Sequence, residues 1–201
     1  MEFQIIAGEL CLDFINTLDN RPSPERHTEL LSTYGNLADW AFQAGAIGPA
    51  QKGALLAAAA RRPHAAVAAL RKAIELRECL YRIISHGLRN QRPDPSDVKV
   101  FNGFLGEALG RLQLQLRRGG YRLQFPGVSG PRLDSLLWPI AKSASNLLTS
   151  GDLSYVHECD SPSCRWMFVD RSKNHSRRWC DMKVCGNRLK ARRFYHRQHT
   201  S

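Results

Sequence analysis

The chain has 201 residues, of which 43% are hydrophobic, and a formal net charge of +11 at pH 7. This composition supplies enough apolar residues for a packed core, which excludes a largely disordered chain. No apolar run approaches the roughly 20 residues that a membrane-spanning helix needs. Residues 171–201 hold ten Lys or Arg residues and one acid, Asp181, a net charge of +9 that leaves only +2 for the rest of the chain. We therefore expect an anionic partner for the C-terminal segment.

The first predicted element is a short buried helix over residues 10–18, because its apolar residues recur every four positions. The other side of this helix carries Asp13, Asn16 and Thr17. Together with Arg21, these residues are candidates for a polar pocket that binds a small-molecule effector. The alternative is that their side chains cap local backbone groups.

Helical periodicity predicts five more helices in the first 150 residues. Their expected spans are residues 29–44, 49–62, 64–89 and 133–148, and a helix capped by Asp94 or Ser96 that ends at Leu109. In the longest of them, helical spacing predicts a buried face made of Val67, Leu70, Ile74, Tyr81, Ile84 and Leu88.

The period of the pattern changes between the last two of these helices. Residues 112–116 and 121–125 strictly alternate apolar and polar side chains around Arg-Arg-Gly-Gly, which is typical of a β-hairpin. Residues 1–150 are therefore predicted to form one mainly helical domain with a β-hairpin. A smaller domain is expected over residues 153–201, so that the predicted fold class is α+β, mainly α.

Four cysteines in the smaller domain have the spacing of a metal site: Cys159, Cys164, Cys180 and Cys185. They form two pairs with four intervening residues each, separated by fifteen residues, and such pairs can converge on one tetrahedral Zn²⁺. Four sulfur ligands leave no open position for catalysis, so the zinc is predicted to be structural. Disulfides or redox use are alternatives. They are disfavoured because the chain opens without a signal peptide, which predicts a cytoplasmic protein with reduced thiols.

The segment around these cysteines predicts a knuckle, a hairpin and a helix. Residues 159–164 form the knuckle, residues 166–169 a strand and residues 177–179 the returning strand. Residues 186–197 are rich in helix-forming side chains. This order resembles the treble-clef arrangement.

Particular motifs in the chain resemble a known pair of families. Cys-Gly-Asn-Arg at residues 185–188, with Trp-Met-Phe-Val-Asp at 166–170 and Ser-Arg-Arg-Trp-Cys at 176–180, resembles the CGNR zinc finger. Leu-Cys-Leu-Asp-Phe-Ile-Asn-Thr-Leu at 10–18 and Leu-Ala-Asp-Trp at 37–40 resemble the ABATE domain that accompanies this finger. The resemblance implies a bacterial, stress-induced transcription regulator whose zinc finger binds DNA.

Basic side chains in the zinc module are the expected DNA contacts, because guanidinium and ammonium groups bind phosphate oxygens and guanine edges. The candidates are Arg177, Arg178, Arg188, Lys190, Arg192, Arg193 and Arg197. The alternative is a solvated basic tail that only keeps the protein soluble.

Two other functions stay open at this point. Zinc modules with Arg-rich helices also bind folded RNA, although the chain lacks an RNA-recognition aromatic motif. The helical domain would carry the chemistry if the protein were an enzyme, but we find no nucleophile elbow, phosphate-binding glycine loop or metalloprotease motif and predict no enzyme. A homodimer is expected, because single small modules seldom reach useful specificity on DNA.

Overall fold

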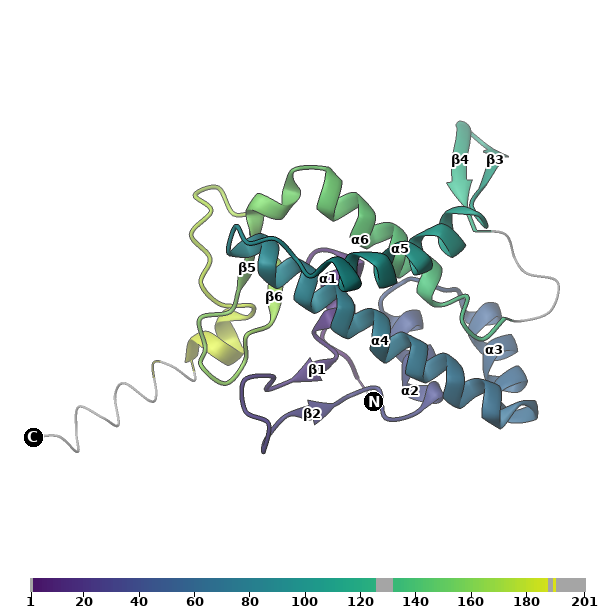
Figure 1. The fold of residues 1–201 in the computed structure, drawn as a ribbon, viewed down its shortest axis with the longest axis horizontal. Helices are drawn as coiled ribbons and strands as arrows, with labels where there is room; N and C mark the ends of the chain where they lie inside the picture. The colour runs from purple at the N-terminus through teal and green to yellow at the C-terminus, as the bar shows by residue number, and fades with distance from the viewer. Residues whose placement is uncertain (1, 126–131, 188–189, 191–201) are drawn as a thin grey trace, which may run out of the picture.

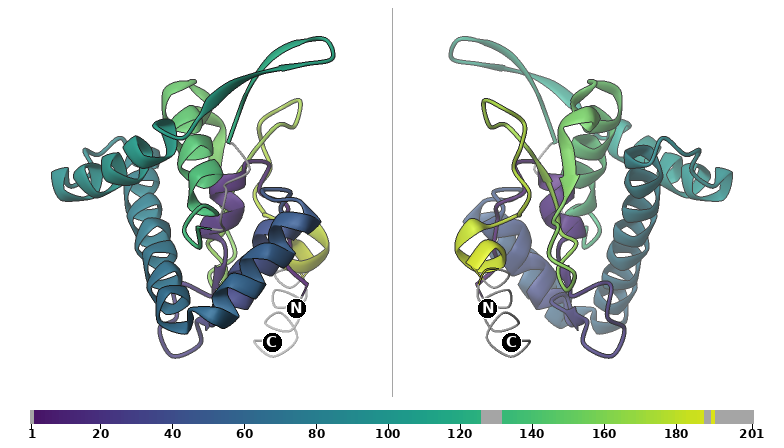
Figure 2. Two further views of the ribbon diagram at one scale, coloured as in Figure 1. Left: turned by 90° about the vertical axis from the view of Figure 1, so that its right-hand side faces the viewer. Right: turned by 90° about the vertical axis from the view of Figure 1, so that its left-hand side faces the viewer.

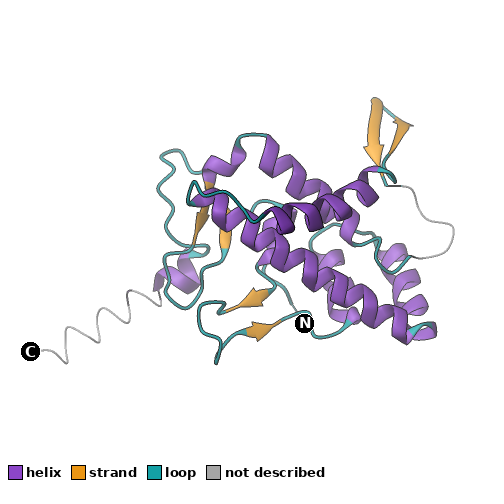
Figure 3. Ribbon diagram, in the orientation of Figure 1, coloured by secondary structure: helices purple, strands orange, loops and turns teal. Residues whose placement is uncertain are grey.

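The computed structural model describes residues 2–125, 132–187 and 190. Six α-helices dominate these residues, and three short antiparallel strand pairs lie at the edge of the helical layer (Figure 1, Figure 3). The helices are α1 (Leu10–Ile15), α2 (Tyr34–Gln43), α3 (Pro49–Arg61), α4 (Pro63–Leu88), α5 (Pro95–Leu109) and α6 (Leu137–Thr149). The α+β, mainly α fold class is thus confirmed.

The strands pair with near neighbours in the chain. The three pairs are β1 (Leu18–Asp19) with β2 (Thr28–Glu29), β3 (Gln113–Arg117) with β4 (Gly120–Gln124), and β5 (Val156–Glu158) with β6 (Met167–Val169). Two short helical turns complete the fold, the 3-10 helix η1 (Asp152–Tyr155) and the π-helix η2 (Met182–Gly186). The β3–β4 hairpin confirms the alternating pattern seen in the sequence.

The core is built around α1, which lies beside α6 and also contacts α4 (Figure 2). Phe14 of α1 is fully buried and packs on Trp40 of α2, with 5.1 Å between the ring centroids. None of the helices in the described residues has both the length and the apolar character needed to cross a bilayer.

The helices differ from the sequence prediction in several details. Helix α1 ends at Ile15 instead of residue 18, and α6 begins at Leu137 instead of residue 133. Helix α2 begins at Tyr34 instead of residue 29, because the Thr33 side chain accepts a hydrogen bond from the Asn36 backbone and caps the helix, while Thr28 and Glu29 pair with β1. The predicted buried face of α4 was right at Ile84, which is fully buried, and wrong at Val67, which is 68% exposed. The buried stripe holds Ala66, Ala69 and Ala73, whose small side chains allow neighbouring helices to approach closely.

The predicted returning strand at residues 177–179 was also wrong. Strand β6 pairs with β5, which precedes the first cysteine, so the hairpin encloses the first cysteine pair. Residues 177–179 run as an irregular segment, because the Arg177 backbone N–H donates to the Asp170 side chain at 2.7 Å. Residues 188–189 and 191–197, which carry most of the predicted C-terminal helix, lie outside the described residues.

Candidate metal centre

The four cysteines of the C-terminal module meet at one point. The Sγ atoms of Cys159, Cys164, Cys180 and Cys185 all lie within 4.8 Å of one another, and all four residues are buried. The Sγ–Sγ distances are 3.6 Å between Cys164 and Cys180 and 3.7 Å between Cys180 and Cys185. A tetrahedral zinc with Zn–S bonds of about 2.3 Å requires about 3.8 Å between sulfurs, whereas a disulfide requires about 2 Å. The cluster therefore has the dimensions of a four-sulfur zinc site.

The first cysteine pair sits in the connection between β5 and β6. The Cys159 backbone N–H donates to the Trp166 carbonyl at 2.8 Å and so extends the strand pairing by one step. The Cys164 N–H donates to the Ser161 carbonyl at 3.0 Å and closes a tight turn. Arg165 follows in the left-handed region with φ of 60°, which turns the chain back toward β6.

The second pair is held by the π-helix η2. The Asp181 side chain accepts hydrogen bonds from the backbone N–H groups of Lys183 and Val184 and caps this helix directly after Cys180. The Cys185 N–H donates to the Asp181 carbonyl at 2.9 Å. A backbone hydrogen bond from the Asp160 N–H to the Arg178 carbonyl, 2.9 Å long, joins the two halves of the site.

The electrostatics of the cluster suit a bound cation. Hydrogen bonds from the Cys164 and Cys180 thiols lower the pKa of Cys159, and backbone N–H groups of Cys180 and Ser161 add to this effect. The same contact with Cys159 raises the pKa of Cys164 and of Cys180, and burial raises the pKa of Cys185. Four buried sulfurs this close cannot all ionise on their own, and a bound Zn²⁺ supplies the positive charge that ionises a coordinating thiol.

The metal module is fastened to α1 by buried hydrogen bonds. The Asn16 side chain donates from Nδ2 to the Met167 carbonyl at 2.8 Å and accepts from the Met167 N–H at 2.9 Å. The Val169 N–H donates to the Ala7 carbonyl at 2.8 Å. The zinc module thus shares a continuous hydrogen-bonded contact with the start of the helical domain.

The other candidate pocket residues are also bonded within the protein. Asp13 Oδ1 accepts from the backbone N–H groups of Ile6 and Ala7 at 2.8 and 2.9 Å. Burial raises the pKa of Asp13 to about 6. Thr17 donates its hydroxyl to the Phe14 carbonyl, so both residues satisfy local backbone groups, as the structural alternative proposed. Arg21 pairs with Glu78 at 2.5 Å. A ligand-binding role for this group stays a prediction.

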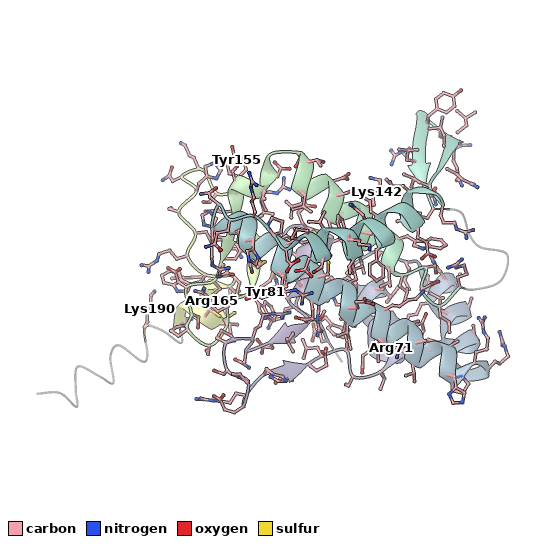
Figure 4. The ribbon with its side chains drawn as sticks, in the orientation of Figure 1. Arg71, Tyr81, Lys142, Tyr155, Arg165 and Lys190 are labelled. Atoms are coloured by element: carbon pink, nitrogen blue, oxygen red, sulfur yellow. The ribbon has the colours of Figure 1, made fainter. Side chains whose placement is uncertain are left out.

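The basic side chains of the module fall into two groups. Arg177 is half-buried, donates to the carbonyls of Trp179 and Cys180, and lies 4.3 Å above the Phe168 ring centroid. Arg178 pairs with Asp160 at 2.6 Å. Lys190 is exposed, and it lies with Arg165 at the zinc end of the molecule (Figure 4). Arg188, Arg192, Arg193 and Arg197 are outside the described residues.

Sequence reasoning missed two exposed lysines in this module. Lys173 lies in the loop after β6 and Lys183 in η2, and both side chains are exposed. Within the described part of the chain, neither side chain makes a hydrogen bond or an ion pair, in contrast to Arg165 and Arg178. The signal available in the sequence was their place in the basic segment over residues 171–201.

Comparisons with known families agree with this architecture. The ABATE family model, described as "Putative stress-induced transcription regulator", matches residues 8–151. The CGNR zinc finger model matches residues 156–198, a range that contains all four cysteines. A search of curated proteins found no match to the chain. Taken with the geometry of the cluster, these matches identify one structural Zn²⁺ as the cofactor.

Proposed function

Because the chain belongs to the ABATE family and carries a CGNR zinc finger, we propose that it is a zinc-dependent DNA-binding protein that regulates transcription in the cytoplasm. Cys159, Cys164, Cys180 and Cys185 bind the zinc, and the module around them contacts DNA. The observation that carries this proposal is the concentration of positive charge in the C-terminal segment of the chain, next to the metal site. Residues 171–201 hold +9 of the net +11 charge of the chain.

The zinc has a positioning role in this proposal. When bound, it neutralises the four sulfurs and fixes η2 against the β5–β6 connection. Lys190 follows η2 closely in the chain, so the metal would set where this cation lies. Arg177 holds the carbonyls of Trp179 and Cys180 and supports the site from inside. The phosphate contacts fall to Lys173, Lys183 and Lys190, with Arg178, Arg188, Arg192, Arg193 and Arg197.

The helical domain acts as the regulatory part. Asn16, the residue that directly follows α1, bonds to β6 through its side chain, so a ligand that shifts α1 would also shift the strand beside the metal site. We include a small-molecule effector and a homodimer in this proposal. Neither family description names an enzyme.

Duplex-DNA binding measured by fluorescence anisotropy over a salt series tests the proposal. About five phosphate contacts predict a slope of roughly −4.5 in a plot of log K against log salt concentration. Zinc-loaded protein is expected to bind with this slope, and chelated protein to bind far more weakly. Equal binding with and without zinc would reduce the activity to the charge of a tail, and no binding at low salt would overturn the proposal.

A matched pair of double variants separates a local contact from overall charge. Lys183→Ala with Lys190→Ala removes two cations from the zinc module. The control, Arg71→Ala with Lys142→Ala, removes two cations from α4 and α6, away from the zinc end (Figure 4). The first variant is expected to make the slope less steep by about 1.8, and the control to leave it unchanged. Tighter binding of structured RNA than of duplex DNA at matched salt would assign the module to RNA instead.

A further inference from the structure

The β3–β4 hairpin carries an exposed apolar face. Leu114, Leu116, Tyr121 and Leu123 are 64%, 72%, 71% and 59% exposed. Leu114 pairs with Leu123 and Leu116 with Tyr121 across the two strands, and residues two apart on a strand point to the same side. The four side chains therefore share one face of the hairpin, which we call the apolar hairpin face.

The opposite face of the same hairpin is polar. Gln113 pairs with Gln124, and Gln115 pairs with Arg122. The tip is a two-residue connection, Arg118 and Gly119, in which Gly119 adopts φ of 94°. This strict division into one apolar and one polar face is the pattern of a sheet that packs on one side and meets water on the other.

Nothing in the described residues covers the apolar hairpin face. The hairpin projects from the end of α5, and its strands pack mainly on each other (Figure 1). An isolated two-stranded hairpin is marginally stable in water, and an independent fold needs a further layer on its apolar side. The apolar hairpin face thus has the composition of a core without its second layer.

We infer that a second copy of this chain supplies the missing layer. Two such hairpins pack face to face as a small sandwich, with about 10 Å between the sheets and all eight apolar side chains inside. The apolar hairpin face bears no charge, so a twofold pairing brings no like charges into its centre. Arg122 lies on the outer face in this arrangement and stays in water.

The size of the face supports a reversible dimer. At the exposures given above, the four side chains leave on the order of 500 Å² of surface per copy, so that pairing buries about 1,000 Å² in total. This total is at the lower limit for a specific interface. An interface of this size is typical of a weak, reversible association, so we expect dimers and monomers to coexist in solution.

The inference deepens the homodimer included in the proposed function and gives it a surface. The hairpin and the zinc module lie at opposite sides of the helical layer (Figure 1). Pairing through the hairpin therefore leaves both zinc modules free. Two modules in one particle would bind two half-sites, and this gain in specificity is the usual reason for dimeric regulators.

Analytical ultracentrifugation of the zinc-loaded full chain, from 1 to about 500 µM, tests the inference. The wild type is expected to show a monomer–dimer equilibrium. Leu116→Thr with Tyr121→Thr keeps strand propensity but removes apolar surface, and should raise the dissociation constant at least tenfold. The control is Val67→Thr, which alters an equally exposed apolar residue on α4 and should leave the equilibrium unchanged.

Three results would overturn the inference: a wild type that stays monomeric throughout, a dimer that persists in the double variant, or growth beyond the dimer. Amide hydrogen exchange over residues 113–124 gives a second measurement, because dimerisation should slow exchange there as concentration rises. DNA binding is measured separately at 1 µM protein. A failure of DNA binding leaves the ultracentrifugation result intact, and a monomeric wild type leaves zinc-dependent DNA binding intact.

Discussion

The two longer strand pairs of this molecule have similar local structure and opposite surroundings. In β5–β6, Met167 and Phe168 are fully buried, and the connection between the strands holds two of the four cysteines. In β3–β4, the strands are longer, yet the large apolar residues are more than half exposed. The short strands β5 and β6 are therefore held by buried side chains and by the cysteine cluster beside them. The longer strands β3 and β4 are held mainly by their hydrogen bonds to each other. The burial of a hairpin, more than its length, determines what it contributes to the fold.

Loss of the metal should have the largest effect on the packing of β5–β6. Cys164→Ser removes one of the four sulfurs and should lower the zinc content from one ion per chain to well below one. Structural zinc contributes on the order of 10 kcal/mol to folding in small modules, so β5–β6 should lose its ordered packing. The helical domain should keep its helices, because the contact between Phe14 and Trp40 that packs α1 on α2 involves none of these cysteines. Zinc analysis and circular dichroism check both statements.

The control for this variant is Cys11→Ala, which alters a buried free cysteine outside the cluster. It should retain one zinc per chain. A Cys164→Ser protein that still binds one zinc ion with wild-type affinity would show that the metal is held by other residues.

Truncation of the central β6 side chain is expected to have the next largest effect. Phe168 is fully buried, and Arg177 and His157 contact its ring. Phe168→Ala should therefore lower the free energy of unfolding by about 3–5 kcal/mol, as a removed aromatic core residue does. Urea denaturation of the zinc-loaded protein measures this value. A loss below about 1 kcal/mol would contradict the buried position of this strand.

Removal of the hydrogen bonds between Asn16 and β6 should have the third largest effect on the stability of β5–β6. Asn16→Ala leaves the Met167 N–H and carbonyl without partners in a buried place. Each of the two unsatisfied groups costs about 1–3 kcal/mol, so we expect a loss of about 2–6 kcal/mol in urea denaturation. Asn146→Ala on the exposed side of α6 is the control and should change stability by less than about 0.5 kcal/mol. Equal effects of the two variants would show that the link does not hold the module.

The buried carboxyl of Asp13, which binds the segment beside β6, should make the stability of the protein depend on pH. Burial raises the pKa of this carboxyl from 3.8 to about 6, so the folded protein holds the proton more tightly than the unfolded chain. The free energy of unfolding should therefore fall as pH rises from about 4 to about 6, by at most about 3 kcal/mol. Asp13→Asn keeps the acceptor for Ile6 and Ala7 and cannot ionise, so it should lack this decrease.

The measurement is the difference in unfolding free energy between Asp13→Asn and the wild type at pH 4, 5, 6 and 7. Taking the difference removes the effect of zinc release at low pH, which both proteins share. The difference should be near zero at pH 4 and favour the variant at pH 7. A difference that does not change with pH would mean that the pKa of Asp13 is ordinary in the fold.

The difference between β3–β4 and β5–β6 also explains how much of the structure could be predicted from the sequence alone. The β3–β4 pairing depends on neighbouring residues and a tight turn, and strict alternation was enough to predict it. The cysteine cluster followed from spacing because zinc demands four sulfurs. The partner of β6 was mispredicted, because β5 precedes the cysteines and its pattern is only three residues long. The Asn16–Met167 link joins residues 151 positions apart, and no local pattern reports such a contact.

Burial was the other quantity that local patterns could not predict. Helix α4 carries two adjacent stripes at helical spacing, and a hydrophobicity pattern favours the one that contains Val67. In the first half of the helix the alanine stripe is buried in place of Val67, because small side chains allow close helix packing, whereas Ile84 of the predicted face is buried as expected. In the same way, the alternation of β3–β4 predicted an apolar face without showing that the described residues leave it uncovered.

The smallest expected effect is at the exposed hairpin. Leu116→Ala should change the free energy of unfolding by less than about 0.5 kcal/mol when measured at 1 µM protein, where the chain is monomeric. The same variant should weaken dimerisation at higher concentration, because the side chain is 72% exposed in the single chain and becomes buried only in the pair. A loss above 1 kcal/mol at 1 µM would mean that the hairpin packs on its own chain, and the difference between the two strand pairs would then disappear. A concentration-dependent loss would instead establish that β3–β4 finds its hydrophobic partner between molecules, while β5–β6 finds it within one.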